Sequence, residues 1–168
     1  MGKVFKITFF LVSVLLFVYV VPPSSEFPSQ LPNSVQSFEP ADVETPLRRG
    51  YYTNLTRQEV IAHYEKEFNK GFFYSPKLNY PPEEAQSIIR DQTKSTFLEE
   101  LVHPLRESLY INGFESKKTI YQLVIDDVTW DQKIIVRYVP SSVFVRILIL
   151  SLIVVSSYLL VREYRHGK

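Results

Sequence analysis

The sequence predicts an α+β fold, in which a small domain of two helices and then a meander of about three to four antiparallel strands lies between two transmembrane helices. Three observations support this. Long apolar runs lie near both ends of the chain, at 4–21 and 143–161. Between them, apolar residues recur at helical spacing up to Val102. After Pro104 they alternate with polar residues, as strands with one buried face do.

The composition limits the classes of function. The 168 residues include 19 basic and 18 acidic side chains, so no basic surface for nucleic acid is expected. Cysteine is absent, which excludes disulfides, thiolate metal sites and a cysteine nucleophile. The 5 glycines are too dispersed for a phosphate-binding loop. We therefore predict neither a cofactor nor a nucleic-acid partner.

The first apolar run, 4–21, follows a short N-terminus at 1–3 that we expect in the cytoplasm. Lys3 and Lys6 precede its main body, as in a signal sequence. The small residues of a cleavage site are missing, because Val20 and Val21 are followed by Pro22 and Pro23. We favour an uncleaved signal anchor, with cleavage as the alternative.

The second apolar run, 143–161, would be about 28 Å long as a helix, close to the hydrocarbon thickness of a bilayer. The basic tail 162–168 follows it, whereas no Lys or Arg occurs between Pro22 and Leu47. The positive-inside rule then places both termini in the cytoplasm and the central domain outside the cell membrane. If the first run were cleaved, the domain would still lie outside on one anchor.

The segment 22–46 is predicted to be a linker. Prolines and serines dominate it, so it carries too little apolar surface to fold and is biased to an extended conformation. A spacer is the favoured interpretation, and a proline-rich docking site for a partner is the alternative.

The folded domain is predicted over 47–139, beginning with a short strand at Arg48–Thr53. Thr56 and Glu59 have the spacing of a capping box, which starts a helix. The apolar residues of this helix share one face and consist of Val60, Ile61, Tyr64 and Phe68. Asn54 begins a glycosylation sequon, although an asparagine beside a helix cap more often serves the turn.

A second helix is predicted from Pro82 to about Val102, with a break near 92–95 as an alternative. Proline and acidic residues open it, and Pro104 ends it. Strands follow, with a hairpin turn expected at Asn112-Gly113. The later strands are predicted at Thr119–Thr129 and Lys133–Val139. Only Pro140, Ser141 and Ser142 separate the last strand from the second span, so the domain is expected at the membrane surface.

Two segments resemble known patterns. FLEELVHPLRESLYINGFE (97–115), with VRYVPSS (136–142) before a hydrophobic tail, resembles an uncharacterised family of bacterial membrane proteins. That resemblance implies no specific function. TNLTRQEVIAHYEKEFNKGF (53–72) is similar to a capped helix common in small exported α+β domains. Neither resemblance implies site residues.

The candidate site residues fall into two groups. A pocket lined by aromatic residues is expected from Phe72, Phe73, Tyr74 and Tyr80. Arg146 lies inside the second span, where a charge either contacts a partner helix or extends to the lipid headgroups.

Metal sites are weakly indicated. Glu100 and His103 have the Glu-x-x-His spacing of di-iron bundles, but only one copy is present. Asp126, Asp127 and Asp131 lack the spacing of a calcium loop. We predict no metal, no catalytic residue and no enzymatic activity.

The favoured function is a non-enzymatic interaction module or accessory subunit of a membrane or envelope complex. Its partners would be the lipid bilayer and another membrane protein. A ligand-binding or sensory domain that uses the aromatic pocket is the alternative. A third class is an envelope enzyme acting on lipid or glycan through acids such as Glu99, Glu100 or Asp127.

Overall fold

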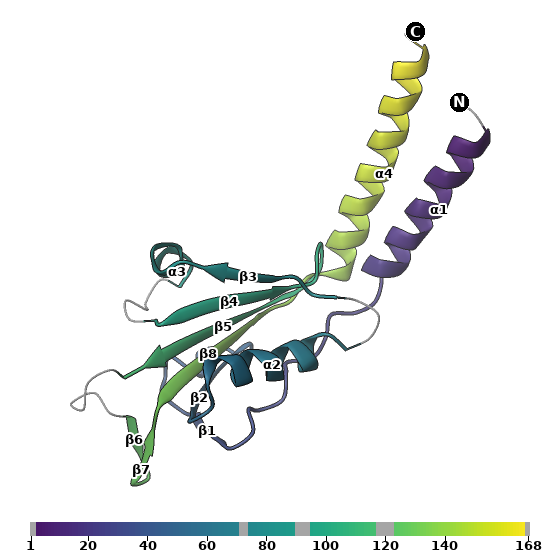
Figure 1. Cartoon of the computed structure of the whole chain (residues 1–168). Coiled ribbons are helices and arrows are strands. Elements are labelled where there is room, and N and C mark those ends of the chain that lie inside the picture. Colours follow the sequence, from purple (N-terminus) through teal and green to yellow (C-terminus); the bar gives the residue numbers. More distant parts are fainter. Residues whose placement is uncertain (1–2, 71–73, 90–94, 117–122, 167–168) are drawn as a thin grey trace. The chain divides into compact units, whose positions relative to one another are not determined.

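The computed structural model describes residues 3–70, 74–89, 95–116 and 123–166 (Figure 1). The chain divides into two compact units. A helical unit comprises Met1–Ser24 and Pro140–Lys168, and a domain comprises Ser25–Val139.

The helical unit consists of α1 (Lys3–Val20) and α4 (Val143–His166). Both helices are long and apolar enough to cross a membrane, by length and composition. They contact each other through Phe9 and Tyr158, whose ring centroids lie 6.1 Å apart. The guanidinium of Arg165 lies 4.9 Å from the ring centroid of Phe5. Two terminal helices of this kind were predicted, and both are present.

The domain is built on a six-stranded antiparallel sheet in the order β1-β2-β8-β5-β4-β3. Its strands, in that order, are Ser34–Ser37, Arg48–Thr53, Gln132–Val139, Ser108–Glu115, Phe97–Val102 and Lys77–Tyr80. A separate two-stranded hairpin joins β6 (Leu123–Ile125) to β7 (Val128–Trp130). The strands predicted at 48–53 and 133–139 are therefore confirmed, and both lie in the larger sheet.

Helix α2 (Arg57–Phe68) covers one face of this sheet (Figure 1). Thr56 and Glu59 form the predicted capping box, with each side chain bonded to the other residue's backbone N–H. The four apolar residues of the predicted face are all buried. They belong to one core with the inward residues of the central strands, including Leu109, Ile111, Ile134 and Val136.

The second predicted helix is mostly wrong. Helix α3 covers only Pro82–Ile88, and Phe97–Val102 is strand β4. Residues 90–94, where the break was considered, are outside the described residues. In β4, Leu101 belongs to the core on the face that α2 covers, while the neighbouring Glu100 is also buried. The apolar residues of FLEELV flank two adjacent acids and so match the i, i+3, i+4 spacing of a helix, whereas in the sheet both faces of the strand, including both acids, are buried. The α+β class holds, but two strands precede α2, so helices do not come first.

The hairpin turn predicted at Asn112-Gly113 is also wrong, because both residues lie inside β5. Gly113 is required by packing. A Cβ added there would overlap Cε1 of Phe97 on the paired strand. The turn lies instead at Asp126 and Asp127, with φ of 51° and 61°, between β6 and β7. The strand predicted over 119–129 is thus interrupted there, and its part at 119–122 is outside the described residues.

The segment predicted as a linker differs most from expectation. Ser34–Ser37 forms the edge strand β1, and Leu31 is buried in the core. Asp42 is buried and accepts a hydrogen bond from Ser37 Oγ at 2.6 Å. Its carboxylate also lies 2.6 Å from Lys133 Nζ. The prolines do not prevent this arrangement, because none lies within β1: Pro32 precedes the strand and Pro40 follows it.

Candidate functional site

Of the residues predicted to line an aromatic pocket, the structure describes Tyr74 and Tyr80. Phe72 and Phe73 lie outside the described residues. Tyr74 is 80% exposed and precedes β3, whereas Tyr80 ends β3. Tyr74 and Tyr80 therefore lie at opposite ends of this strand.

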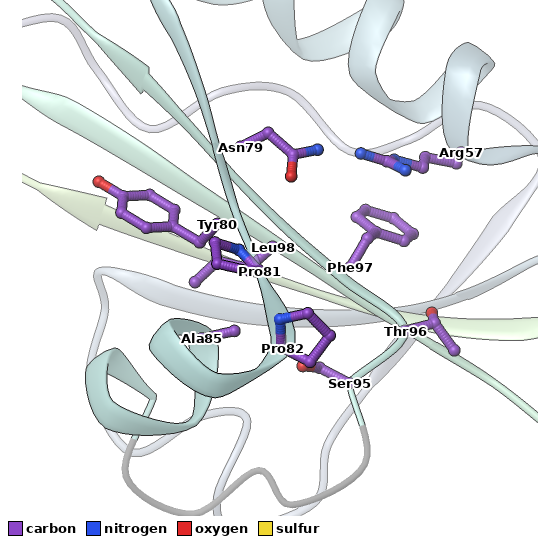
Figure 2. Close-up of a pocket in the computed structure, with 10 residues that line it drawn as sticks. All are labelled: Arg57, Asn79, Tyr80, Pro81, Pro82, Ala85, Ser95, Thr96, Phe97 and Leu98. Atoms are coloured by element: carbon purple, nitrogen blue, oxygen red, sulfur yellow. The ribbon is translucent and has the colours of Figure 1, made fainter.

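A pocket of about 110 Å³ lies at the Tyr80 end of β3. Figure 2 shows the guanidinium of Arg57 and the amide of Asn79 pointing toward each other beside the ring of Phe97, whereas Tyr80 points away. The guanidinium lies 5.2 Å from the Phe97 ring centroid, a cation–π distance. The remaining lining is contributed by Tyr80, Pro81, Pro82, Ala85, Ser95, Thr96 and Leu98.

Glu99 binds two of the side chains that line this pocket. It is buried, and its Oε1 accepts hydrogen bonds from Arg57 and from Asn79 Nδ2, the latter at 2.8 Å. Its Oε2 is buried and has no hydrogen-bond partner among the described residues. The carboxylate offsets the charge of Arg57, the one charged residue among the described residues that line the pocket. The described lining therefore forms a small polar and aromatic recess.

The opposite face of the sheet carries a second polar cluster. Tyr80 donates its hydroxyl hydrogen bond to Glu100, whose cross-strand neighbour on β5 is Tyr110. Burial and the Glu100 carboxylate raise the pKa of both tyrosines above the ordinary value. Because Glu99 and Glu100 are adjacent in an extended strand, their side chains point to opposite faces. The two carboxylates are therefore separate groups rather than an acid–base pair.

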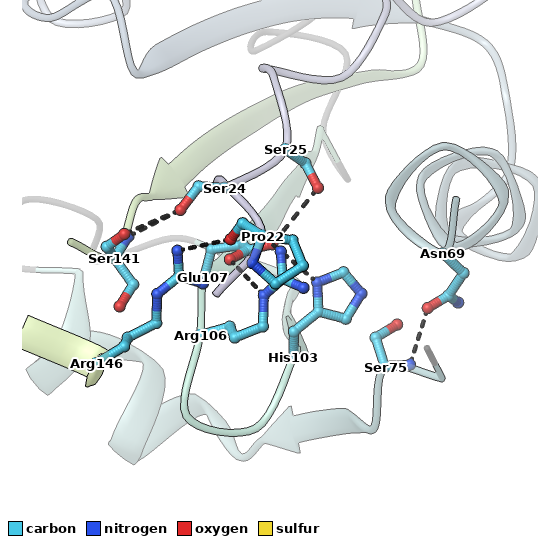
Figure 3. Close-up of polar contacts among 10 residues, drawn as sticks. All are labelled: Pro22, Ser24, Ser25, Asn69, Ser75, His103, Arg106, Glu107, Ser141 and Arg146. Carbon is cyan, nitrogen blue, oxygen red and sulfur yellow. Dashed lines mark hydrogen bonds and ion pairs between the residues drawn. The ribbon is translucent and has the colours of Figure 1, made fainter. Parts of the chain in front are cut away.

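A third cluster occupies the loop between β4 and β5 (Figure 3). His103 Nδ1 lies 3.2 Å from Glu107 Oε1, and Arg106 donates to the same oxygen at 2.9 Å. Ser25 Oγ approaches this oxygen at 3.4 Å. Burial raises the pKa of Glu107, but its bonds to His103 and Arg106 outweigh this and lower the pKa to about 2. The cluster holds a buried carboxylate in its ionised form.

The metal arrangements considered from sequence are not formed by the described residues. Glu100 lies within β4 and bonds to Tyr80, whereas His103 follows the strand and contacts Glu107. Asp126 and Asp127 form a tight turn. Within 3–70, 74–89, 95–116 and 123–166, no group of three or more histidine or acidic side chains could hold a metal ion.

Arg146 lies in the first turns of α4 and is 4% exposed. Its Nη2 donates to the carbonyl of Pro22 at 3.0 Å (Figure 3). Nearby, Ser24 Oγ donates to the carbonyl of Ser141 at 3.0 Å. Arg146 thus links the start of α4 to the residues that follow α1. This is a contact within the chain that sequence reasoning did not consider.

Comparison with known proteins gives no match. No family model matches the chain, and no curated protein or solved structure gives a significant match. The resemblance of 97–115 and 136–142 to bacterial membrane proteins stays a prediction.

Several residues of these polar clusters were not identified from sequence. Arg57 and Asn79 contact Glu99 because α2 and β3 lie against β4, and no local sequence pattern predicts that contact. Similarly, the residues next to Glu107 in the sequence did not indicate that its side chain is buried. Arg57 had one recognisable feature, since it directly follows the helix cap Thr56.

Proposed function

We propose that this chain is a membrane-anchored, non-enzymatic interaction module that serves as an accessory subunit of a membrane or envelope complex. The observation that supports it most is the placement of a folded domain, Ser25–Val139, between two helices apolar enough to be membrane spans. The Lys and Arg residues beside the two apolar runs favour display of the domain outside the cytoplasmic membrane.

The buried acids of the described domain support a non-enzymatic role, because each has a stabilising partner. Asp42 pairs with Lys133, and Glu99 pairs with Arg57. Glu100 accepts from Tyr80, and Glu107 pairs with His103 and Arg106. An enzyme built on two carboxylates would bring them into one site with separated pKa values. Here Glu99 and Glu100 face opposite sides, and Asp127 lies in the hairpin turn.

The size of the pocket favours interaction over small-molecule sensing. Pockets for drug-sized ligands usually enclose about 300–1,000 Å³, whereas the pocket beside Phe97 measures about 110 Å³. That volume suits a single side chain of a partner. A ligand-binding domain remains the second candidate function, and the Arg57 and Phe97 pair is the feature that favours it.

The test is cross-linked co-purification of the full-length protein from its native membranes. A photo-reactive residue would replace Phe38, which is 78% exposed on the domain. The matched control places the same group at Leu160, an exposed position of α4. We expect one partner, at near-stoichiometric yield, captured from position 38. Recovery of the protein alone from both positions would contradict the accessory-subunit proposal.

The orientation has its own test. Protease added to intact cells should cleave within 26–139, since the domain is proposed to lie outside. Full protection of this region in intact cells, with cleavage after lysis, would place the domain in the cytoplasm.

A further inference from the structure

The loop between β4 and β5, His103–Glu107, lies at the end of the domain where the chain enters and leaves. The domain begins at Ser25, whose hydroxyl approaches Glu107 Oε1 at 3.4 Å. It ends at Val139, which pairs with Ser108, the residue directly after the loop. Both attachment points of the helical unit therefore lie beside this loop within the domain.

Leu105 at the tip of the loop has an unusual conformation. Its φ is 62°, in the left-handed region that favours glycine or asparagine, and it is 62% exposed. The loop is closed by the N–H of His103 donating to the carbonyl of Glu107 at 3.0 Å. Beneath the backbone, the buried Glu107 carboxylate contacts the side chains of His103 and Arg106 and so stabilises the loop. The domain thus holds an apolar side chain in a strained, exposed position, as is common at functional sites.

A second exposed apolar residue occurs at the same end of the sheet. Tyr74 precedes β3, and the carbonyl of Pro76 accepts from the N–H of Val102 at 2.9 Å, one residue before His103. Ser75 N–H donates to Asn69 Oδ1 at 2.8 Å, beside the exposed Lys70. Leucine, tyrosine and lysine side chains together are typical of surfaces that lie in the lipid headgroup region.

We propose that Leu105 and Tyr74 form an interfacial anchor that inserts into the lipid headgroup region. The inference rests on the proposed anchoring of the chain by α1 and α4. Val139 and Val143 are joined by residues that reach at most about 14 Å, and Val20 and Ser25 by a segment that reaches about 18 Å. With both tethers this short and both attached beside the loop, the bilayer surface lies within reach of Leu105. Contact with lipid would orient the domain on the membrane.

The experiment uses the full chain, whose lack of cysteine allows single labels. Leu105→Cys, Tyr74→Cys and the control Val128→Cys are labelled with an environment-sensitive nitrobenzoxadiazole dye. Val128 is exposed, and it lies in the hairpin that precedes Gln132, the opposite end of β8 from Val139. Each protein is reconstituted into phosphatidylcholine and phosphatidylglycerol vesicles that carry nitroxide quenchers at the headgroup or deep in the acyl chains.

We expect dyes at 105 and 74 to shift to the blue and to be quenched several-fold more by headgroup nitroxides than the dye at 128. Replacing Leu105 with Asn, which tolerates the left-handed conformation, should reduce quenching at position 74 while the fold is kept. Equal, water-like signals at 105, 74 and 128 in protein that floats with the vesicles would overturn the anchor and leave the membrane attachment intact. Protein that fails to float with the vesicles would instead contradict the proposed attachment by α1 and α4.

Discussion

The imidazole of His103 stacks on the ring of Phe68, with the ring centroids 4.2 Å apart and the planes 4° apart. This contact joins the last residue of α2 to the loop after β4, and it places His103 Nδ1 beside Glu107. The end of the domain that carries the chain's entry and exit is therefore held by one aromatic stack and one buried ionic cluster.

Glu107→Gln should destabilise the domain by about 3 kcal/mol near neutral pH, because it leaves buried donors without their charged acceptor. The same magnitude follows from the fall in the Glu107 pKa from 4.5 to about 2. Urea unfolding of the full chain in detergent, followed by fluorescence of Trp130, the single tryptophan, measures it. The exposed Glu44→Gln is the control. Equal unfolding midpoints for both variants would contradict the role of the cluster.

The same carboxylate predicts a pH dependence. Because the pKa of Glu107 is lower in the folded protein, its contribution is complete above about pH 4.5 and is lost as pH falls toward 2. His103 and Arg106 are the charged or titratable groups that contact it among the described residues. Between pH 4.5 and 2.5, the free energy of unfolding should therefore fall less for Glu107→Gln than for the unmodified chain. An equal fall in the free energy of unfolding of the two proteins over this interval would contradict the explanation.

Thr56→Ala should reduce the free energy of unfolding by about 1 kcal/mol, since it removes the acceptor for the Glu59 N–H at the start of α2. The same urea titration measures the change. Thr45→Ala is a matched control, because Thr45 is exposed in a loop and contributes its carbonyl to the Arg48 N–H. We expect the control to stay within about 0.5 kcal/mol of the unmodified chain.

Gly113→Ala should destabilise the domain by about 2 kcal/mol or more, because the added Cβ overlaps the Phe97 ring. Phe97→Leu, introduced together with it, should recover part of the loss by removing the ring. A double-mutant cycle measures the coupling between the two positions. If the losses of stability in the two single variants simply added in the double variant, the Phe97 ring would not be the reason that position 113 requires glycine.

Asp127→Gly should stabilise the β6–β7 hairpin by about 0.5–1 kcal/mol, because the left-handed φ of 61° costs a glycine little. Asp131→Gly is the matched control, since Asp131 has no positive φ and the change only increases the freedom of the unfolded chain. Trp130, at the end of β7, reports the transition. A loss of stability in Asp127→Gly would contradict the turn.

Arg146→Leu should leave the chain in the membrane and weaken the pairing of α1 with α4, because the bond to the Pro22 carbonyl is lost. Cysteines placed at Phe9 and Tyr158, whose rings lie 6.1 Å apart, can be joined by a short thiol-reactive linker. We expect a high yield of the intramolecular cross-link when residue 146 is arginine and a markedly lower yield when it is leucine. If alkaline buffer extracted the Arg146→Leu protein, but not the unmodified protein, from membranes, the arginine would instead be required for insertion.

Local chemistry in the sequence determined the elements whose signals lie within a few residues. The Thr56 and Glu59 spacing predicted the start of α2, because a cap acts within one helical turn. The apolar runs predicted α1 and α4, because a span requires only length and hydrophobicity. Lys133–Val139 was recognised as a strand by its alternating residues, and Arg48–Thr53 lies where a short strand was expected before the helix cap.

The tertiary structure alone decided the rest. Phe97–Val102 became a strand because two faces of the sheet were available to bury it, and no spacing within the segment encodes that. The proline-rich segment joined the core through Leu31, which is buried in one cluster with residues of α2 and of the sheet that are distant in sequence. Arg57 with Glu99, and His103 with Glu107, are likewise contacts made by folding. Their energies depend on burial, which a sequence specifies only once the whole chain has packed.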